Sequence, residues 1–393
     1  MQAEKIIIEF NDLTAEQNEK LSQSIISVDF TNFITALSGQ AEISFNWFSA
    51  SFYSEIQSVF YKYSAVNVFI TKNNITNTLI KGFCLREKIV IENSRVVFVV
   101  TIVANTHALY LQHIKPFDLF ESVNYKSLIQ SIIKNNNLEK TYDQIIFTSL
   151  EKEIDGQTYS STGQTVYNYI EQILNDFNLK LFTSCYKSSL KDLQILHFYD
   201  SGTYIENITK DYNQILSNIN VINIKADIDY SYFPDIVTVE SDQGFDDNNF
   251  TTEKTIKTKN IRSLGFNKIN ERKNFILPEI LFTKKIKNNS TDDDSSDYAI
   301  ALLRDSVFNG LQLQVQVNSL FTDTFNSKYC WTLGKKIDIE NDLIKTYLKN
   351  KFDIYLKNND KYYFVINGVE YSYSEEGMKC TLTLSPNDLI YSN

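Results

Sequence analysis

Apolar and polar residues alternate in several parts of the chain, which predicts β-strands with one buried face. The clearest case is LQLQVQV at 311–317, where Leu or Val fills every second position and Gln fills the others. The stretch AEISFNWF alternates in the same way, with Ile43, Phe45 and Trp47 on one face. RVVFVVTIVA at 95–104 is apolar almost throughout, which predicts a strand buried on both faces. These patterns place strand-rich regions toward both ends of the chain.

A helical period replaces this alternation in the middle of the chain. SVNYKSLIQSIIKNNN predicts a helix within 122–137, with Ser122 or Asn124 as its N-cap. Its apolar stripe consists of Leu128, Ile129, Ile132 and Ile133. A second helix is predicted over 165–178, with Thr165 as the cap. Its apolar face consists of Val166, Tyr169, Ile170, Ile173, Leu174 and Phe177. The short strands LKLFTSC and LQILHFYD follow, so this part predicts a small α+β unit.

The remaining segments return to strands, apart from one long polar tract. NVINIKADIDYSYF, DIVTVES, KYYFVINGVEYSY and MKCTLTLSP all favour strands. The tract over 242–297 is rich in Asp, Asn and Ser, and we expect extended loops or partly disordered excursions there, with ILPEILF as one short strand or an anchor. A helix is expected over 297–310, ending at Gly310.

Composition and charge narrow the class of protein. A length of 393 residues with 43% hydrophobic content is enough for more than one domain. A net charge of −10 argues against a protein that binds nucleic acid non-specifically. No apolar run is long enough to span a bilayer, and MQAEKIIIEF does not resemble a signal peptide. We therefore expect a soluble protein made in the cytoplasm, with no membrane partner and four reduced cysteines: Cys84, Cys185, Cys330 and Cys380.

The sequence contains no convincing catalytic or metal-binding pattern. His107 and His113 are six residues apart, His197 is distant, and no further ligands complete a zinc site. The acidic run 292–294 lacks the glycine turn of a calcium loop. No GxxxxGK[ST] or GxSxG motif occurs, and no carboxylate pair is favoured. We expect a protein that is not an enzyme and that uses no metal and no cofactor.

The order of the segments resembles the baseplate hub family of tailed phages, which includes the phage Mu hub, late control protein D and the hub part of VgrG. The resemblance covers most of the chain and is strongest over 160–200 and 311–390. One motif is W-x-x-G before an alternating strand, here in YCWTLGKKIDIENDL. The other is G-x-x-x-x-L-x-L-x-P near the end. The matching positions are Trp331, Gly334, Ile337, Ile339, Gly377, Leu382, Leu384 and Pro386.

The resemblance implies an α+β, mainly β fold, with two similar tube-type β-barrels and a small inserted α+β domain. The first barrel would occupy 1–120 and the inserted domain 121–204. Strands of the second barrel, the polar excursion and a helix would occupy 205–310, and the rest of the second barrel 311–393. The tract over 242–297 departs from the family pattern.

The resemblance also implies a role. Three copies would form a pseudo-sixfold ring in the baseplate of a virion tail, joining the tail tube protein to the central spike protein. Baseplate wedge and tape measure proteins are further expected neighbours. DNA or an effector would pass through the lumen without specific binding, and we expect carboxylates to line it. Phage tails, tailocins and other injection machines all fit this reading.

Within that architecture Trp331 would fill the end of the second barrel, and Gly334 would permit a tight turn. Ile337 and Ile339 would face inward, with charged residues between them facing outward. Two other classes remain open: a tail-associated peptidoglycan hydrolase, which needs paired carboxylates or a metal, and a sugar-binding adhesin, which needs exposed aromatic faces.

Overall fold

The computed structural model describes most of the chain in segments. These are residues 4–34, 36, 38–46, 48–61, 63–92, 95–114, 123–147, 153–154, 163–176, 179–187, 192–200, 214–216, 221–232, 236–242, 251–257, 281–287, 309–321, 330–339, 342–344, 346, 363–375 and 377–386. Most of the expected helix over 297–310, the acidic run 292–294 and Trp47 lie outside these residues.

A twelve-stranded sheet dominates the structure and is built from both ends of the chain. Its N-terminal half consists of β1 (Lys5–Phe10), β2 (Ile25–Phe33), β3 (Gln40–Asn46), β4 (Ala65–Lys72), β5 (Ile75–Glu92) and β6 (Arg95–Ala104). Its C-terminal half consists of β12 (Gln214–Leu216), β13 (Val221–Ile228), β17 (Leu311–Val317), β18 (Lys336–Ile339), β19 (Tyr363–Ser374) and β20 (Gly377–Pro386). The main path is β1-β4-β5-β6-β3-β2-β19-β20-β17-β13, and β18 joins β12 to β19.

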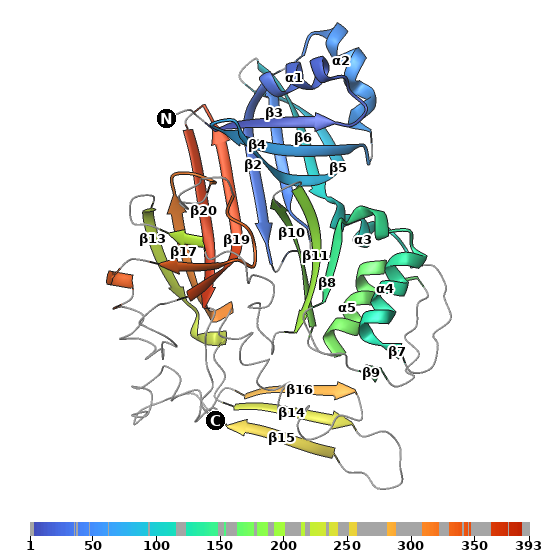
Figure 1. Cartoon of the computed structure of the whole chain (residues 1–393), viewed down its shortest axis with the longest axis vertical. Helices are drawn as coiled ribbons and strands as arrows, with labels where there is room; N and C mark the ends of the chain where they lie inside the picture. The colour runs from blue at the N-terminus through green and yellow to red at the C-terminus, as the bar shows by residue number, and fades with distance from the viewer. Residues whose placement is uncertain are drawn as a thin grey trace.

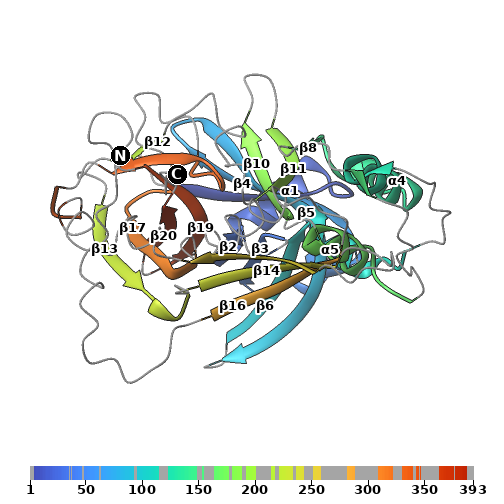
Figure 2. The ribbon, with the colours of Figure 1, turned by 90° about the horizontal axis from the view of Figure 1, so that it is seen from below.

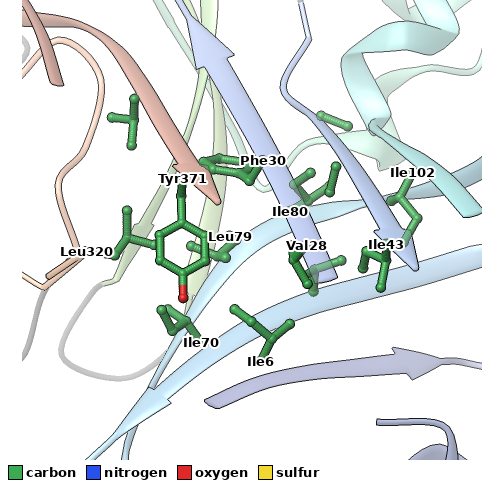
Figure 3. Close-up of a cluster of buried hydrophobic side chains, with 14 of the residues drawn as sticks. Ile6, Val28, Phe30, Ile43, Ile70, Leu79, Ile80, Ile102, Leu320 and Tyr371 are labelled. Atoms are coloured by element: carbon green, nitrogen blue, oxygen red, sulfur yellow. The ribbon is translucent and has the colours of Figure 1, made fainter. Parts of the chain in front are cut away.

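The two halves are joined where β2 pairs with β19 in antiparallel register, Phe30 opposite Tyr371. Around this junction one hydrophobic core runs through both halves. Figure 3 shows Tyr371 from β19 lying among Phe30, Ile70 and Leu320. Figure 2 shows the sheet curling from β13 through β17, β20 and β19 toward β2 and β3. The structure is therefore mainly β with one large curled sheet. Two separate barrels with an inserted domain stay a prediction.

Local chemistry explains how the N-terminal strands turn and bend. The hairpin between β4 and β5 turns over Asn73 and Asn74 alone, with φ of 51° and 63°. Asn tolerates this left-handed region better than most residues. The register of β5 against β6 shifts between Cys84 and Arg86, and a Cβ on Gly82 would lie 1.9 Å from the Val103 carbonyl oxygen. Close approach and a bulge together bend this long hairpin.

Two short helices cover the N-terminal half. They are α1 (Ala15–Gln23) and α2 (Ala50–Ile56), and α2 continues into the 3-10 turn η1 (Gln57–Phe60). Thr14 forms a capping box with Gln17 at the start of α1. Asn18 and Ser22 on α1 accept hydrogen bonds from backbone N–H groups of β1, so the helix is fixed to the edge of the sheet.

The middle of the chain folds around its own hydrophobic core (Figure 1). Its elements are η2 (Asn105–His107), α3 (Ala108–Leu111), β7 (Val123–Asn124), α4 (Tyr125–Asn135), η3 (Glu139–Thr141), β8 (Gln144–Phe147), β9 (Glu153–Ile154), α5 (Val166–Asp176), β10 (Leu179–Lys187) and β11 (Asp192–Asp200). The predicted stripes are confirmed: the apolar residues named for both helices are buried, apart from Phe177, which lies outside the described residues. Asn124 caps α4, and Thr165 accepts from the Asn168 backbone N–H at the start of α5.

The polar tract contains more regular structure than we expected. β15 (Thr251–Lys257) and β16 (Leu281–Lys287) lie within it and pair on either side of β14 (Ile236–Asp242). β16 begins inside the ILPEILF stretch, where a short strand was one of the two expectations. The expectation of loops was wrong for residues 251–257, which form β15. β15 and β16 carry Thr, Ile and Phe between lysines, residue types that suit a pleated strand even where the surroundings are polar.

β13 is shorter than expected, and β6 is buried on both faces over much of its length. The strand expected over 220–233 ends at Ile228, and the 3-10 turn η5 (Tyr230–Tyr232) follows. In β6, both faces are buried between Phe98 and Val100 and between Ile102 and Ala104, as the apolar run predicted. None of the helices in the described segments combines the length and apolar character that a membrane span needs.

Candidate functional site

The large sheet has one apolar face and one mostly polar face, and the polar face is the candidate functional surface. From the outer part of β5 across to β13, strand register places these polar side chains on it: Asp29, Thr31, Gln40, Glu42, Arg86, Lys88, Thr101, Asn223, Lys225, Asp227, Gln312, Gln314, Gln316, Glu370, Ser372, Lys379 and Thr381. All of them are exposed or half-buried. We call this set the polar face. The opposite face, the core face, carries the hydrophobic core.

Register aligns the polar face in rows that cross both halves of the sheet. One row runs from Gln316 on β17 through Thr381 on β20 and Glu370 on β19 to Thr31 on β2. The neighbouring row runs through Asp29 of β2. A continuous strip of hydroxyl, amide and charged groups therefore spans the junction between the two halves.

The charges on the polar face are balanced. It carries four carboxylates (Asp29, Glu42, Asp227 and Glu370) and four basic side chains (Arg86, Lys88, Lys225 and Lys379). Asp29 lies directly opposite Glu42, and the pKa of Asp29 is raised by partial burial and, secondarily, by the charge of Glu42. Glu42 also lies near a cation, because Lys88 Nζ is 3.7 Å from Glu42 Oε1. The remaining groups are uncharged, so this surface offers many hydrogen-bonding groups without a strong field of either sign.

The stretch around Trp331 lies against the core of the C-terminal half. Trp331 is 5% exposed, and its indole N–H donates to the Ser319 carbonyl oxygen over 3.0 Å. Its backbone N–H donates to Leu320. Gly334 has φ of 75°, the left-handed region that favours glycine, and its N–H donates to Ile366.

The other predicted motif positions lie on neighbouring strands. Ile337 and Ile339 on β18 are buried, as are Leu382 and Leu384 on β20. Gly377 opens β20 with φ of 123°, at the tight turn after β19, and Pro386 ends β20 opposite Phe364. These placements agree with core and turn positions. Their assignment to a second tube-type barrel stays a prediction.

A buried polar cluster that the sequence did not reveal fastens the two halves together. The Glu4 carboxylate accepts from Lys72 Nζ over 3.1 Å and from the Ser319 hydroxyl, and Lys72 Nζ also contacts Ser319 Oγ at 2.8 Å. The side chain of Glu4 is 2% exposed. Its three members are separated by up to 315 residues, so no local pattern signals it. We call these three residues the Glu4 cluster.

The histidines lie at separate places. His107 Nδ1 is 3.3 Å from Ser38 Oγ, and His197 Nε2 is 2.8 Å from Ser184 Oγ. Burial and, secondarily, Lys335 lower the pKa of His197 to about 3, so its imidazole is neutral. Across the described residues, no three His, Cys, Asp or Glu side chains gather as metal ligands.

The described cysteines show no sign of activation. Cys84, Cys330 and Cys380 form no disulfide, and burial raises the pKa of Cys84 to about 11 and raises that of Cys380 as well. Buried thiols of this kind are protonated and chemically inert.

A small cavity lies beside Trp331, between β2, β19 and β10, with Phe30, Leu79 and Val369 among its lining residues. Its volume of about 30 Å³ holds about one water molecule and is too small for a sugar or a peptide.

Comparisons with known proteins place this architecture. No protein-family model matches the chain, and no curated relative matches it. The fold is similar to a 43 kDa tail protein of prophage MuSo2 from Shewanella oneidensis, with a TM-score of 0.62 and 11% identity over 98% of this chain and 99% of that one. It is also similar to a tail protein from Neisseria meningitidis, with a TM-score of 0.65 and 10% identity over 99% and 98% of the two chains.

Secretion-system proteins share the fold as well. The E. coli c3393 protein, a type VI secretion component described as similar to T4 tail proteins gp27 and gp5, gives a TM-score of 0.53 at 10% identity over 97% of this chain and 77% of that one. A chain of a PdpA–VgrG complex gives 0.58 at 11% identity over 100% and 66%. The structural neighbours are thus phage tail proteins and proteins related to the secretion-system spike. This set of neighbours is consistent with the baseplate hub-like family that the sequence resembles.

Proposed function

We propose that this protein is a structural, non-enzymatic baseplate hub whose three copies form a ring between a tail tube and a central spike. The observation that carries the proposal is the division of one curled sheet into two halves of six strands each. Three copies supply six such halves around one axis. A ring of this kind presents near-sixfold symmetry to a sixfold tube while keeping threefold symmetry for a threefold spike.

The similarity to tail proteins supports this assignment at the level of the whole chain. The match with the two tail proteins extends over nearly the full length of both partners in each comparison. A shared single domain would leave most of the longer chain unmatched. The likeness therefore extends along the whole chain and is not confined to one part of it.

In this proposal the polar face lines the lumen. A channel that conducts DNA or an effector protein needs a wetted wall without a strong attraction for its cargo. Four carboxylates and four basic groups among uncharged side chains, mostly Gln and Thr, give such a wall. The sequence led us to expect carboxylates to line the lumen. In the present proposal carboxylates do line it, and basic side chains match them in number.

The test is the mass and shape of the purified full-length chain at high concentration. We expect light scattering to give the mass of three chains and electron-microscope class averages to show a threefold ring with an open channel. A mass of one chain at every accessible concentration, with compact particles, would overturn the ring.

Cargo passage has its own readout. We expect the ring to leave double-stranded DNA unretarded in a mobility assay at physiological salt, because the polar face lacks a basic stripe. Tight, salt-sensitive DNA binding would contradict a lumen of this composition.

A further inference from the structure

The outer end of β5 has one edge without a partner among the described strands. β4 pairs with β5 only as far as Phe83, whereas β6 pairs with it as far as Glu92. The segment from Arg86 to Ile91 therefore presents an open backbone edge. Two large apolar side chains lie exposed on this segment, Ile89 at 52% and Ile91 at 73%. An open edge with exposed isoleucines is a template for pairing with another strand.

β13 forms the other open edge of the same sheet. It pairs with β17 on one side and with no described strand on the other. Its core-face residues, Ile224, Ala226 and Ile228, are only half-buried. Figure 1 shows β13 at the left margin of the molecule and β5 toward the right, so the two edges do not meet within one chain.

We infer that the outer part of β5 in one copy pairs with β13 of the next copy, which continues the sheet around the ring. This inference rests on the proposed ring and specifies the contact that closes it. Eight strands run from β5 to β13 along the sheet, and each pairs with its neighbour in antiparallel fashion. An even number of alternating strands leaves β5 and β13 pointing in opposite directions. Rotation about the ring axis leaves the direction of each strand along that axis unchanged. The seam between β5 of one copy and β13 of the next is therefore antiparallel.

The faces of the sheet restrict the register of this seam. Rotation also keeps the core face of each copy on the same side of the sheet. Ile89 lies opposite buried Phe98 and so belongs to the core face. On β13, Ile224 and Ala226 also belong to the core face, because they pack against the hydrophobic core. Ile89 and Ile91 must therefore meet core-face residues of β13. Every second register meets this condition, and a shift by one residue would turn the isoleucines toward the polar face.

Charge selects among the registers that remain. Setting Lys88 opposite Asp227 also sets Ile89 opposite Ala226 and Ile91 opposite Ile224. A shift by two residues in one direction places Lys88 opposite Lys225, which is unfavourable. The shift in the other direction leaves only residues 89–92 of β5 opposite 225–228, which shortens the ladder. The register with Lys88 opposite Asp227 has the longest ladder without like charges opposed.

The seam residues are available for such contacts. The side chains of Lys88 and Asp227 are 46% and 58% exposed. Among the described residues, each forms one loose ion pair at 3.7 Å within its own chain, with Glu42 and Lys225 respectively. Residues this exposed also accept substitution without loss of the fold.

The experiment is cysteine cross-linking in the full-length chain. The variant Lys88→Cys/Asp227→Cys places two thiols opposite each other across the seam, within the spacing that a disulfide needs. We expect oxidation to give covalent dimers and trimers on a non-reducing gel. The matched control, Lys88→Cys/Lys225→Cys, keeps the same chemistry in the unfavourable register and should cross-link weakly. Lys88→Cys alone and Asp227→Cys alone keep the four native cysteines and should give no ladder.

Charge reversal gives a second readout. The Lys88→Glu trimer should half-dissociate at a concentration about tenfold higher than the wild-type trimer does, because all three of its seams oppose like charges. Adding Asp227→Lys should restore assembly. A trimeric wild-type protein, together with a Lys88→Cys/Asp227→Cys variant that does not cross-link and a Lys88→Glu variant that dissociates like the wild type, would overturn the seam and leave the proposed hub intact. A wild-type monomer would overturn both.

Discussion

Replacing Trp331 with alanine tests how the C-terminal half is held together. The indole is 5% exposed and lies beside a cavity of about 30 Å³, and its N–H donates to the Ser319 carbonyl. Truncation removes the buried ring, enlarges the cavity and leaves the carbonyl without its donor. The strands that flank the site also pair with their neighbours, which limits how far the space can collapse.

The expected magnitude follows from these losses. Truncating a buried large aromatic side chain to alanine typically lowers the free energy of unfolding by roughly 3–5 kcal/mol. The lost hydrogen bond to the Ser319 carbonyl accounts for about 1 kcal/mol of that cost, which is the usual contribution of one neutral hydrogen bond. We therefore expect Trp331→Ala to lower the free energy of unfolding by about 4 kcal/mol. Trp331→Phe keeps most of the apolar volume and should cost about 1–2 kcal/mol.

The assay is urea unfolding followed by far-UV circular dichroism. Leu343 is 82% exposed, so Leu343→Ala is a matched control that should change the unfolding free energy by less than about 0.5 kcal/mol. A midpoint for Trp331→Ala equal to that of the control would refute the reasoning, because it would mean that the indole supports no packed structure.

Three further substitutions follow from other contacts. Gly82→Ala should cost more than about 3 kcal/mol, because its Cβ would lie 1.9 Å from a carbonyl oxygen of β6, and urea midpoints measure this. Lys72→Met should cost about 2–4 kcal/mol in the same assay, since Glu4 stays buried without its cation, and partial exposure of Lys72 moderates the loss. His197→Gln should reduce the loss of stability between pH 7 and pH 5 by about 2 kcal/mol.

The sign of the pH effect follows from the lowered pKa of His197, about 3 when folded. Between the unfolded pKa near 6.5 and that value, the unfolded chain binds a proton that the folded chain refuses. Stability is therefore present above pH 6.5 and falls as the pH drops. Equal pH dependence in the two proteins would show that the imidazole titrates normally.

Controls separate specific contacts from general fragility. Gly39→Ala meets only the flexible Asn32 side chain, at 3.1 Å, and should be far milder than Gly82→Ala. Combining Glu4→Gln with Lys72→Met should cost less than the sum of the single changes. Additive losses would mean that the two side chains do not interact.

Much of the local structure could be predicted, because it depends on neighbouring residues. LQLQVQV alternates, and in β17 its Leu and Val residues are buried while Gln312, Gln314 and Gln316 are half-buried. The caps at Asn124 and Thr165 follow from side chains that reach the first backbone N–H groups of a helix.

Long-range features escaped prediction for the opposite reason. The pairing of β2 with β19 and the Glu4 cluster join residues more than 200 positions apart, and neither leaves a periodic trace. β15 was missed, and β16 was only partly anticipated, because polar neighbours outweighed their Thr and Ile content. The polar face is visible in single strands, but its continuity depends on register across both halves.

The pairing of β2 with β19 also shapes how the chain is made. Phe30 leaves the ribosome about 340 residues before its partner Tyr371. Throughout that interval the β2 edge of the first half has no strand to pair with, although β3 can already cover its other side. Contacts this distant in sequence form slowly, and uncovered edges invite association with other nascent chains. β19, one of the last strands to be synthesised, thus covers the open edge of β2, one of the first. A chain truncated before β19 is expected to depend on chaperones or to aggregate.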